Sequence, residues 1–183
     1  MAWTTRTSRT AYENRWIRVR EDEVVMPDGH DGVYGVVELR NEAVFVVALD
    51  DEDRVLLVDV DRYTVGRSLE VVAGGSDGDD PLVAAQRELR EEAGLEAATW
   101  VRIGAMDALN GVCVAPEVVF LARGLRPAVS AEELAATHAE EGIAATRWVP
   151  FPEVLGMVAR GEIRDGETMA ALALAGVRLG RFR

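Results

Sequence analysis

The stretch "GGSDGDDPLVAAQRELREEAGL" runs from Gly74 to Leu95 and carries the signals on which the fold assignment depends. Asp80 is a favourable N-cap residue, and Pro81 suits the first position of a helix. Gly94 supplies the left-handed residue with which helices commonly end. These signals predict a helix from Pro81 to Ala93 that follows a glycine-rich loop.

The predicted helix has one apolar side and one acidic side. Glu88, Glu91 and Glu92 lie at i, i+3 and i+4, so they project from the same side. Like charges at this spacing destabilise a helix by about a few tenths of a kcal/mol per pair, and a bound cation would reverse that effect. The alternative is a solvated surface on which the glutamates pair with Arg87 and Arg90. The apolar residues that recur at helical spacing and should face the core are Leu82, Ala85, Leu89 and Ala93.

The 183-residue chain is 49% apolar and 28% charged, a composition that suits one well-buried soluble domain. Its formal net charge is −12 and it has no run of basic residues, so binding to nucleic acid is not expected. The N-terminus has no apolar signal region, and no apolar run is long enough to span a membrane. We therefore expect no membrane partner and a cytoplasmic location.

The residue types that the chain lacks exclude several mechanisms. All twenty basic residues are arginine, which removes Schiff-base chemistry and a phosphate-binding P-loop. Cys113 is the only cysteine, so neither an internal disulfide nor a multi-cysteine zinc site can form. His30 and His138 are the only histidines, neither has a metal-ligand spacing, and no GxSxG motif occurs. Catalytic triads and zinc hydrolysis are therefore not expected.

The remaining segments mix strands, hairpins and helices, which predicts an α+β sandwich. Residues 12–40 read as a small β element around a Gly/Pro turn, and residues 43–60 read as a hairpin around an acidic turn. We expect an N-terminal β element at residues 1–40 and the main domain at residues 41–183. The further strands expected are 69–72, 99–103, 117–122 and 144–149, and the further helices are 152–160 and 167–178.

The nonapeptide "RELREEAGL", which starts at Arg87, resembles the Nudix box. The family pattern is G, five residues, E, seven residues and REUxEExGU, where U is apolar, and the nonapeptide matches every defined position of its second half. The first half differs, because Asp79 stands at the glutamate position and Ala73 at the initial glycine position. Starting from Gly74 instead gives a loop shortened by one residue. The resemblance implies a Nudix-type α/β/α sandwich with a mixed sheet, plus the small N-terminal β element.

The resemblance also implies a metal site on the predicted helix. Glu88 and Glu92 would be the principal ligands, Glu91 would assist and take part in catalysis, and the Ala73 carbonyl would lie nearby. Carboxylate oxygens select hard cations, so we expect Mg²⁺, with Mn²⁺ as a possible substitute. Because the chain is strongly acidic, an anionic diphosphate needs this local positive charge in order to bind.

Two further segments resemble the ADP-ribose pyrophosphatase-like branch of the family. "LEVVAGG" resembles the ExPAG segment of that branch without its proline, and this makes Glu70 and Gly74 candidates for contact with substrate. Within "HAEEGIAATRWVP", Glu140 and Glu141 fall where such enzymes often carry a mobile catalytic glutamate, so one of them is a candidate general base. The alternative for both residues is a solvated loop.

The stretch "VDVDRYTVGR" contains Arg62 and Arg67, where the branch commonly has an RQYR-like stretch. A guanidinium suits the oxygens of a phosphate, so both arginines are candidates for binding substrate. The alternative is an ordinary salt bridge to Asp59 or Asp61. The sequence does not decide between these two roles.

The resemblance predicts an enzyme, a Nudix pyrophosphohydrolase that requires Mg²⁺. Its substrate would be a small-molecule nucleoside diphosphate derivative, ADP-ribose or a related nucleotide sugar, cleaved at the diphosphate bond. The alternative is a non-catalytic Nudix-like domain that binds a nucleotide as a sensor. The resemblance further suggests a homodimer, in which the N-terminal β element contributes to the site of the partner.

Overall fold

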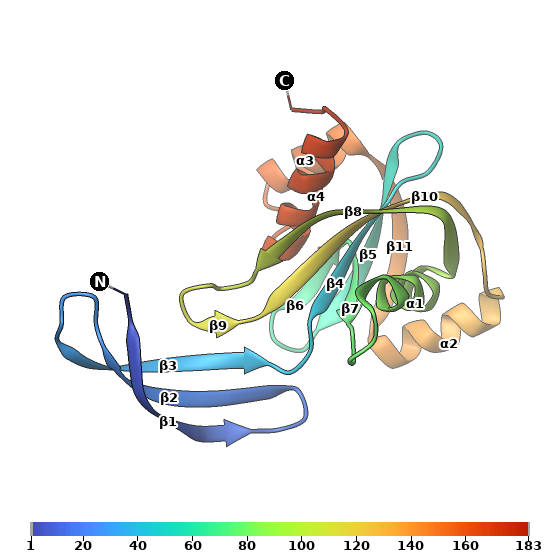
Figure 1. Cartoon of the computed structure of the whole chain (residues 1–183). Helices are drawn as coiled ribbons and strands as arrows, with labels where there is room; N and C mark the ends of the chain where they lie inside the picture. Colours follow the sequence, from blue (N-terminus) through green and yellow to red (C-terminus); the bar gives the residue numbers. More distant parts are fainter. Residues whose placement is uncertain (1, 183) are drawn as a thin grey trace.

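The computed structural model describes residues 2–182, which form a three-layered body and a projecting β-sheet (Figure 1). In the body, α1 and α2 lie on one side of the strands, and α3 and α4 lie on the other. The strands are β1 Thr4–Glu13, β2 Ile17–Val25, β3 Asp31–Leu39, β4 Ala43–Ala48, β5 Arg54–Arg62, β6 Gly66–Glu70, β7 Val72–Gly75, β8 Leu95–Asp107, β9 Cys113–Val114, β10 Pro116–Pro127 and β11 Ile143–Pro150. The helices are α1 Pro81–Ala93, α2 Ala131–Glu141, α3 Phe151–Ala159 and α4 Gly166–Arg178.

Two sheets make the middle layer of the body. One has the order β7-β4-β10-β8 and is mixed, because β10 runs parallel to β4 and antiparallel to β8. The other has the order β11-β5-β6 and is antiparallel. The fold is therefore the predicted α+β sandwich with a mixed sheet.

Strand β4 shows how the three layers are held together. Successive side chains of a strand point to opposite faces, so a strand in the middle layer must be apolar on both. Val44, Val46 and Ala48 pack with α1, whereas the residues between them pack in a second core against α3 and α4. That second set consists of Phe45, Val47 and Leu49.

Two predicted elements, the hairpin at residues 43–60 and the strand 69–72, are each divided between the two sheets. β4 and β5 were expected as a hairpin, but they belong to different sheets and share a single bridge, Leu49 to Val55. The predicted strand 69–72 is broken at Val71, where β6 ends and β7 begins. The amide of Val71 donates to Thr168 Oγ1 at 3.0 Å, which replaces the ladder hydrogen bond. Both differences follow from pairing between segments that are distant in sequence: β4 pairs with β7 and β10, and β5 pairs with β11.

Helix α1 has the bounds that its end signals predict. The side chain of Asp80 accepts from the Leu82 amide at 2.8 Å, and Pro81 occupies the first turn. Gly94 ends the helix in the left-handed region, with φ of 66°. Ala85, Leu89 and Ala93 of the predicted apolar stripe are buried, and Leu82 is partly buried. This packing fixes the direction in which the glutamates point.

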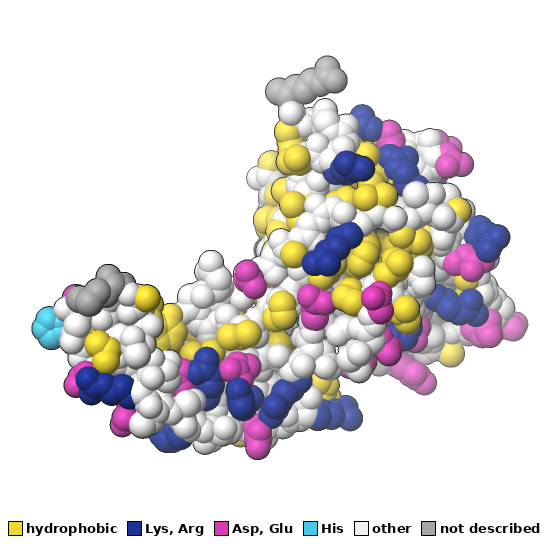
Figure 2. All heavy atoms as spheres, viewed as in Figure 1, with side chains coloured by type: hydrophobic (Ala, Val, Ile, Leu, Met, Phe, Trp, Pro, Cys, Tyr) yellow, Lys and Arg dark blue, Asp and Glu magenta, His cyan; other side chains and the backbone are white. Residues whose placement is uncertain are grey.

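The N-terminal sheet, defined here as the arm, projects from the body (Figures 1 and 2). β1, β2 and β3 form an antiparallel meander, and β1 is exposed along its whole length. The fourth strand is β9, which pairs in parallel with β3 although it lies far along the chain. β1 to β3 of the arm lie within the N-terminal β element expected at residues 1–40, and the arm takes its fourth strand, β9, from later in the chain.

Helix α2 occupies a segment for which a solvated loop was one interpretation. Ser130 and Glu133 form a capping box, in which Ser130 Oγ accepts from the Glu133 amide and the Glu133 carboxylate accepts from the Ser130 amide. Gly142 ends the helix with φ of 73°. Within residues 2–182, no helix combines the length and the apolar character needed to cross a membrane.

Candidate active site

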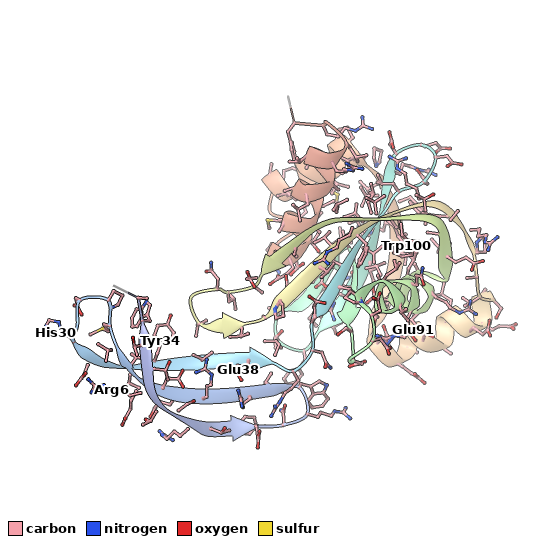
Figure 3. The ribbon with its side chains drawn as sticks, viewed as in Figure 1. Arg6, His30, Tyr34, Glu38, Glu91 and Trp100 are labelled. Carbon is pink, nitrogen blue, oxygen red and sulfur yellow. The ribbon has the colours of Figure 1, made fainter. Side chains whose placement is uncertain are left out.

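The acidic side of α1 faces the loop at the end of β7, beside an open cleft of about 390 Å³. The cleft lies between this loop, the end of β5 and the start of α4. Arg62, Glu70, Ala73 and Gly74, all predicted from the sequence, line it together with Glu117. The three box glutamates come from α1, which runs past the same loop (Figures 1 and 3).

Gly74 lies directly against the carboxylate of Glu88. A Cβ placed on Gly74 would overlap the Glu88 carboxylate. The backbone of Gly74 does not need positive φ, so the requirement for glycine comes from this close approach alone. The loop and the helix are therefore packed together through a glycine and a carboxylate.

Glu92 is held by the same loop one residue earlier. Its Oε2 accepts a hydrogen bond from the Ala73 amide at 3.1 Å, and the residue is only 5% exposed. Burial raises the pKa of Glu92 to about 8, and the charges of Glu88 and Glu141 act in the same direction. The Ala73 hydrogen bond and Arg62 oppose this shift without cancelling it. Glu92 is thus a carboxylate whose negative charge lacks a sufficient counter-charge.

Glu88 is in a similar position. It is 8% exposed, and burial raises its pKa to about 7. Arg87 lowers this pKa, since its Nη2 lies 3.1 Å from Glu88 Oε1, but Glu91 and Glu141 raise it again. The same Nη2 donates to the Gly75 carbonyl at 2.7 Å, so Arg87 fixes the loop and the carboxylate relative to each other.

The donor set fits a hard divalent cation. Buried carboxylates that repel one another, beside the backbone of a loop, suit an ion with oxygen ligands, and such an ion would supply the missing charge. In the part of the chain that the structure describes, no three carboxylate, histidine or cysteine side chains converge into a ready metal-ligand cluster. A cation could bind here only if the glutamate side chains on α1 rotated from these positions.

Glu141 and Glu140, the two candidate general bases, differ in their electrostatic surroundings. The pKa of Glu141 is raised by burial and then by the charge of Glu91, and it is lowered by Arg62. Glu141 in turn raises the pKa of both Glu88 and Glu92. Both side chains are exposed, but Glu140 is not among the charges that shift the pKa of Glu88 or Glu92. Of the two, Glu141 is the one that shares the electrostatic environment of the box.

The two candidate arginines are placed differently. Arg62 pairs with Glu70, with Nη2 at 2.6 Å from Oε2, at the edge of the cleft. Among the described residues its Nη1 makes no hydrogen bond, which leaves one edge of the guanidinium for a ligand. Arg67 instead forms a bidentate pair with Asp59, which Arg147 also contacts, in a separate hollow. The structure does not bring Arg67 to the cleft.

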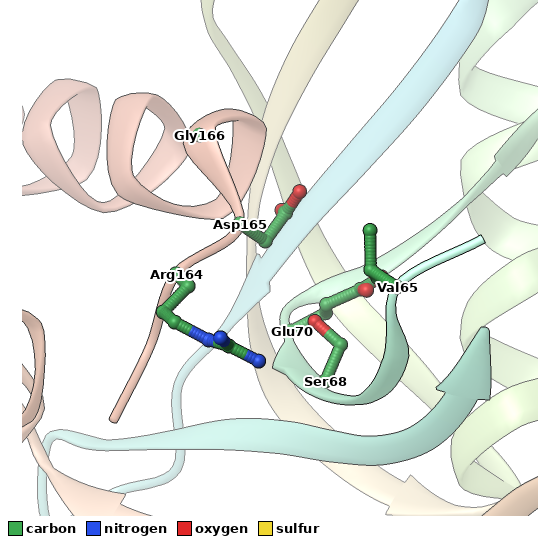
Figure 4. Close-up of a pocket in the computed structure, with 6 residues that line it drawn as sticks. All are labelled: Val65, Ser68, Glu70, Arg164, Asp165 and Gly166. Atoms are coloured by element: carbon green, nitrogen blue, oxygen red, sulfur yellow. The ribbon is translucent and has the colours of Figure 1, made fainter. Parts of the chain in front are cut away.

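Glu117 completes the cleft and was not expected from the sequence as a site residue. It is 6% exposed, and its Oε2 has no hydrogen-bond partner within residues 2–182. Burial raises its pKa to about 7, with further contributions from Glu167 and Asp165 at the start of α4. A second hollow, of about 470 Å³, adjoins the cleft through Glu70 and Asp165 (Figure 4). One wall of the cleft is thus acidic.

Comparison with known proteins assigns this arrangement to a family. The model described as "NUDIX domain" matches residues 39–172, and the model of the "nucleoside diphosphate sugar hydrolase N-terminal domain" matches residues 3–37. The chain belongs to the Nudix family. In this Nudix enzyme, the NUDIX domain match covers the body and the site, and the N-terminal domain match covers most of the arm.

The relatives of this Nudix protein include hydrolases of nucleoside diphosphates. An ADP-ribose pyrophosphatase of Mycobacterium tuberculosis is 38% identical over 93% of this chain and 79% of its own length. An ADP-ribose pyrophosphatase of Bacillus subtilis is 28% identical, over 88% of this chain and 85% of its own. A CMP-5'-(N-acetyl-N-hydroxy-3-aminopropyl)phosphonate hydrolase of Streptomyces rubellomurinus is 27% identical, over 97% of this chain and 84% of its own length.

The fold of this Nudix protein also matches a solved structure. A crystal structure of an ADP compounds hydrolase aligns with a TM-score of 0.81, over 100% of this chain and 97% of that chain, at 21% identity. At this identity the likeness bears on the fold, and it agrees with the predicted Nudix-type sandwich. Together with the family match, the relatives make the protein a pyrophosphohydrolase of the ADP-ribose pyrophosphatase type.

Replacing Gly74 by alanine should disable the site without unfolding the protein. The new Cβ must displace the Glu88 carboxylate. A displacement of a catalytic group by about 1 Å can lower the rate by about 100-fold, so we expect a loss of that order. Gly75→Ala is the matched control, because a Cβ at that position meets its nearest neighbour, Asp77 Oδ1, at an ordinary 3.7 Å. Steady-state hydrolysis and thermal melting of both variants test this. Equal rates for the two variants would contradict it.

The stability of the metal-free protein should fall as pH rises. Glu88 and Glu92 have folded-state pKa values of about 7 and about 8, above the ordinary value of 4.5. Their favourable contribution is complete below the ordinary pKa and is lost as pH rises through the folded values. In EDTA, the melting temperature should therefore fall between about pH 6 and about pH 9, and saturating Mg²⁺ should reverse the fall. A melting temperature that is independent of pH in EDTA would refute this.

Proposed function

We propose that this protein catalyses the Mg²⁺-dependent hydrolysis of ADP-ribose or a related nucleotide sugar. The products would be a nucleoside monophosphate and a phosphorylated sugar. The observation that carries the proposal is the pair of buried carboxylates, Glu88 and Glu92, packed against Ala73 and Gly74 at the edge of the cleft. The names of the M. tuberculosis and B. subtilis relatives support this choice of substrate.

Glu88 and Glu92 would hold the ion, with Glu91 assisting from the same side of α1 and the Ala73 carbonyl nearby. Mg²⁺ suits such an all-oxygen donor set, and Mn²⁺ is a possible substitute. When bound, the ion neutralises the glutamates, withdraws electron density from the diphosphate and lowers the pKa of a coordinated water. Arg87 keeps the Glu88 carboxylate against the loop and would not contact the substrate.

Glu141 would accept the proton of the attacking water. The water oxygen forms a bond to one phosphorus, the bridging P–O bond breaks, and the departing oxygen stays on the second phosphate. The raised pKa of Glu141, caused by burial and by Glu91, suits a base that must take up a proton near neutral pH. Arg62 would bind the diphosphate through the edge that Glu70 leaves free.

The acidic wall of the cleft would select the second half of the substrate. Glu117, Asp165 and Glu167 offer carboxylate oxygens, which accept hydrogen bonds from sugar hydroxyls and repel another phosphate. Trp16 lines a neighbouring cavity of about 400 Å³ together with Gly75 of the loop, and its exposed indole would stack on the base. This arrangement favours a nucleoside diphosphate sugar over a dinucleoside polyphosphate.

The arm would pair with a second copy of the chain. β1 is an edge strand of ten exposed residues, and unpaired edges of this length are usually covered by another element. Trp3, Tyr12 and Trp16 expose more than half of their surface on the arm. We expect sedimentation equilibrium to give the mass of a homodimer, and a monomer at micromolar concentration would remove this part of the proposal.

A substrate panel tests the proposed activity. ADP-ribose, nucleoside diphosphate sugars and a dinucleoside polyphosphate are incubated with Mg²⁺, and phosphate is measured after coupling to a phosphatase. We expect turnover of the first two classes and none with Glu92→Gln, because that substitution removes a carboxylate ligand while keeping its shape. Nucleotide binding without turnover by the wild type would instead support a non-catalytic sensor. Undiminished turnover by Glu92→Gln would remove the box glutamates from the mechanism.

Separate substitutions of Glu141 and Glu140 test the general base. Glu141→Gln should lower kcat by about 100-fold or more, the usual scale for loss of a general base. Glu140→Gln serves as the matched control and should stay close to wild type, since the charge of Glu140 is not among those that act on Glu88 and Glu92. Comparison of kcat for the two variants at saturating Mg²⁺ decides the assignment. The opposite order, or two near-wild-type rates, would overturn it.

A further inference from the structure

Helix α2 carries Glu141 but has few anchors of its own. None of its residues is buried, although its N-terminus is closed by the Ser130 capping box. Nevertheless it lies beside the C-terminal end of α1 (Figure 1). A short exposed helix is marginal on its own, so its position depends on the contacts along one side.

Two of those contacts come from Leu134 and His138, which lie on one stripe with Glu141. Leu134, His138 and Glu141 are spaced at i, i+4 and i+7, which places them on the same side of α2. Leu134 packs at the end of α1, where its Cδ2 would lie 3.2 Å from a Cβ built on Gly94. Glu140 lies off this stripe. The apolar contact is therefore at one end of the stripe and the reactive carboxylate at the other.

His138 makes the contact in the middle of the stripe. Its Nε2 lies 2.7 Å from the backbone carbonyl oxygen of Glu92. A carbonyl can only accept, so Nε2 carries the hydrogen and donates. Glu92 is in the last turn of α1, whose carbonyls have no partner within the helix. The Gly94 amide donates to the carbonyls of Arg90 and Leu89, and His138 donates to the carbonyl of Glu92.

Glu92 is consequently held at two points. Its carboxylate accepts from the Ala73 amide in the loop, and its carbonyl accepts from His138 on α2. The chain leaving α2 is fixed as well, because the Asp61 amide donates to the Gly142 carbonyl at 2.9 Å, next to Arg62. Glu141 lies between these two attachments in the sequence. Its place opposite the α1 glutamates is thereby determined.

We propose that His138 is a positioning residue, which fixes the last turn of α2 to Glu92 of α1 and so places the Glu141 carboxylate at the reacting water. This proposal rests on the proposed function for its kinetic consequence, although the helix-to-helix hydrogen bond itself does not. His138 would touch neither the substrate nor the ion. Its contribution passes through Glu141.

Three substitutions of His138 test the need for a donor at the place of Nε2. His138→Gln carries an amide N–H at a similar reach, whereas His138→Asn is one methylene too short and His138→Ala has none. We expect His138→Gln to retain activity. The other two should lose about 10- to 100-fold in kcat with KM near the wild-type value, since the base and not the binding is displaced. Equal losses in all three, or no loss in His138→Ala, would overturn the proposal.

A double-substitution cycle shows whether the effect passes through Glu141. In a Glu141→Gln background, His138→Ala should lower kcat little further, because the group that it positions has been removed. An undiminished loss in that background would mean that His138 acts independently, and the proposal would fail. Glu132→Gln, on an exposed side of the first turn of α2, controls for general disturbance of the helix.

Amide hydrogen exchange tests the hydrogen bond without relying on turnover. In His138→Ala, the amides of residues 134–142 should exchange faster than in the wild type, while Glu132→Gln and His138→Gln should preserve their protection. If no substrate were hydrolysed but this difference appeared, the proposed function would fail and the attachment of α2 would stand. Unchanged exchange in His138→Ala would overturn the attachment, whatever the activity.

Discussion

The rest of the structure depends on two like-charged carboxylates buried side by side. Glu88 and Glu92 face the backbone of the Ala73–Gly74 loop, almost removed from water, in a chain whose net charge is already −12. Burying an ionised carboxylate without a partner is costly. The charge of Glu88 raises the pKa of Glu92, and the charge of Glu141 raises the pKa of both. In the proposed function, a divalent cation bound to the same carboxylates would offset this cost. The apolar stripe of α1, the three layers and the glycine at position 74 all serve to hold the carboxylates there.

The buried glutamates also determine what the other charged groups around the cleft can do. The proposed substrate is an anion, and Arg62 offers it one free guanidinium edge in the acidic cleft, so a bound cation would provide most of the attraction. Two other arginines are committed to carboxylates: Arg87 fixes Glu88 to the loop, and Arg67 is paired with Asp59 in a separate hollow. Arg164 lines the hollow that adjoins the cleft. The acidic residues that remain, including Glu117, stand where a neutral, hydroxyl-bearing group would be preferred. On the proposed function, positive charge would bind the diphosphate and negative charge would select the sugar in adjacent parts of one cleft.

The sequence predicted the elements that depend on neighbouring residues. It did not predict the features that depend on strand pairing between distant segments. Helix α1, its caps and its apolar stripe follow from neighbouring residues, as do the strands of the body. The break at Val71 and the separation of β4 from β5 depend on partners far along the chain, so the pattern of residues 43–72 did not contain them. α2 did have a signal, the Ser130-to-Glu133 capping box, but its weak apolar character concealed the helix. Arg62 and Arg67 looked alike in sequence, and only the pairing of β5 with β6 assigned them to different partners. Glu117 and His138 stood alone in sequence, and only the folded chain gives them a role.

The pairing of β9 with β3 joins two parts of the molecule that the family comparison treats separately. Val114 is bonded into the arm, and after Ala115 and Pro116 the chain reaches Glu117 in the wall of the cleft. So short a connection, stiffened by proline, leaves almost no slack. A rotation of the arm would therefore displace Glu117, so a protein bound to the exposed strands of the arm would also change the shape of the acidic wall.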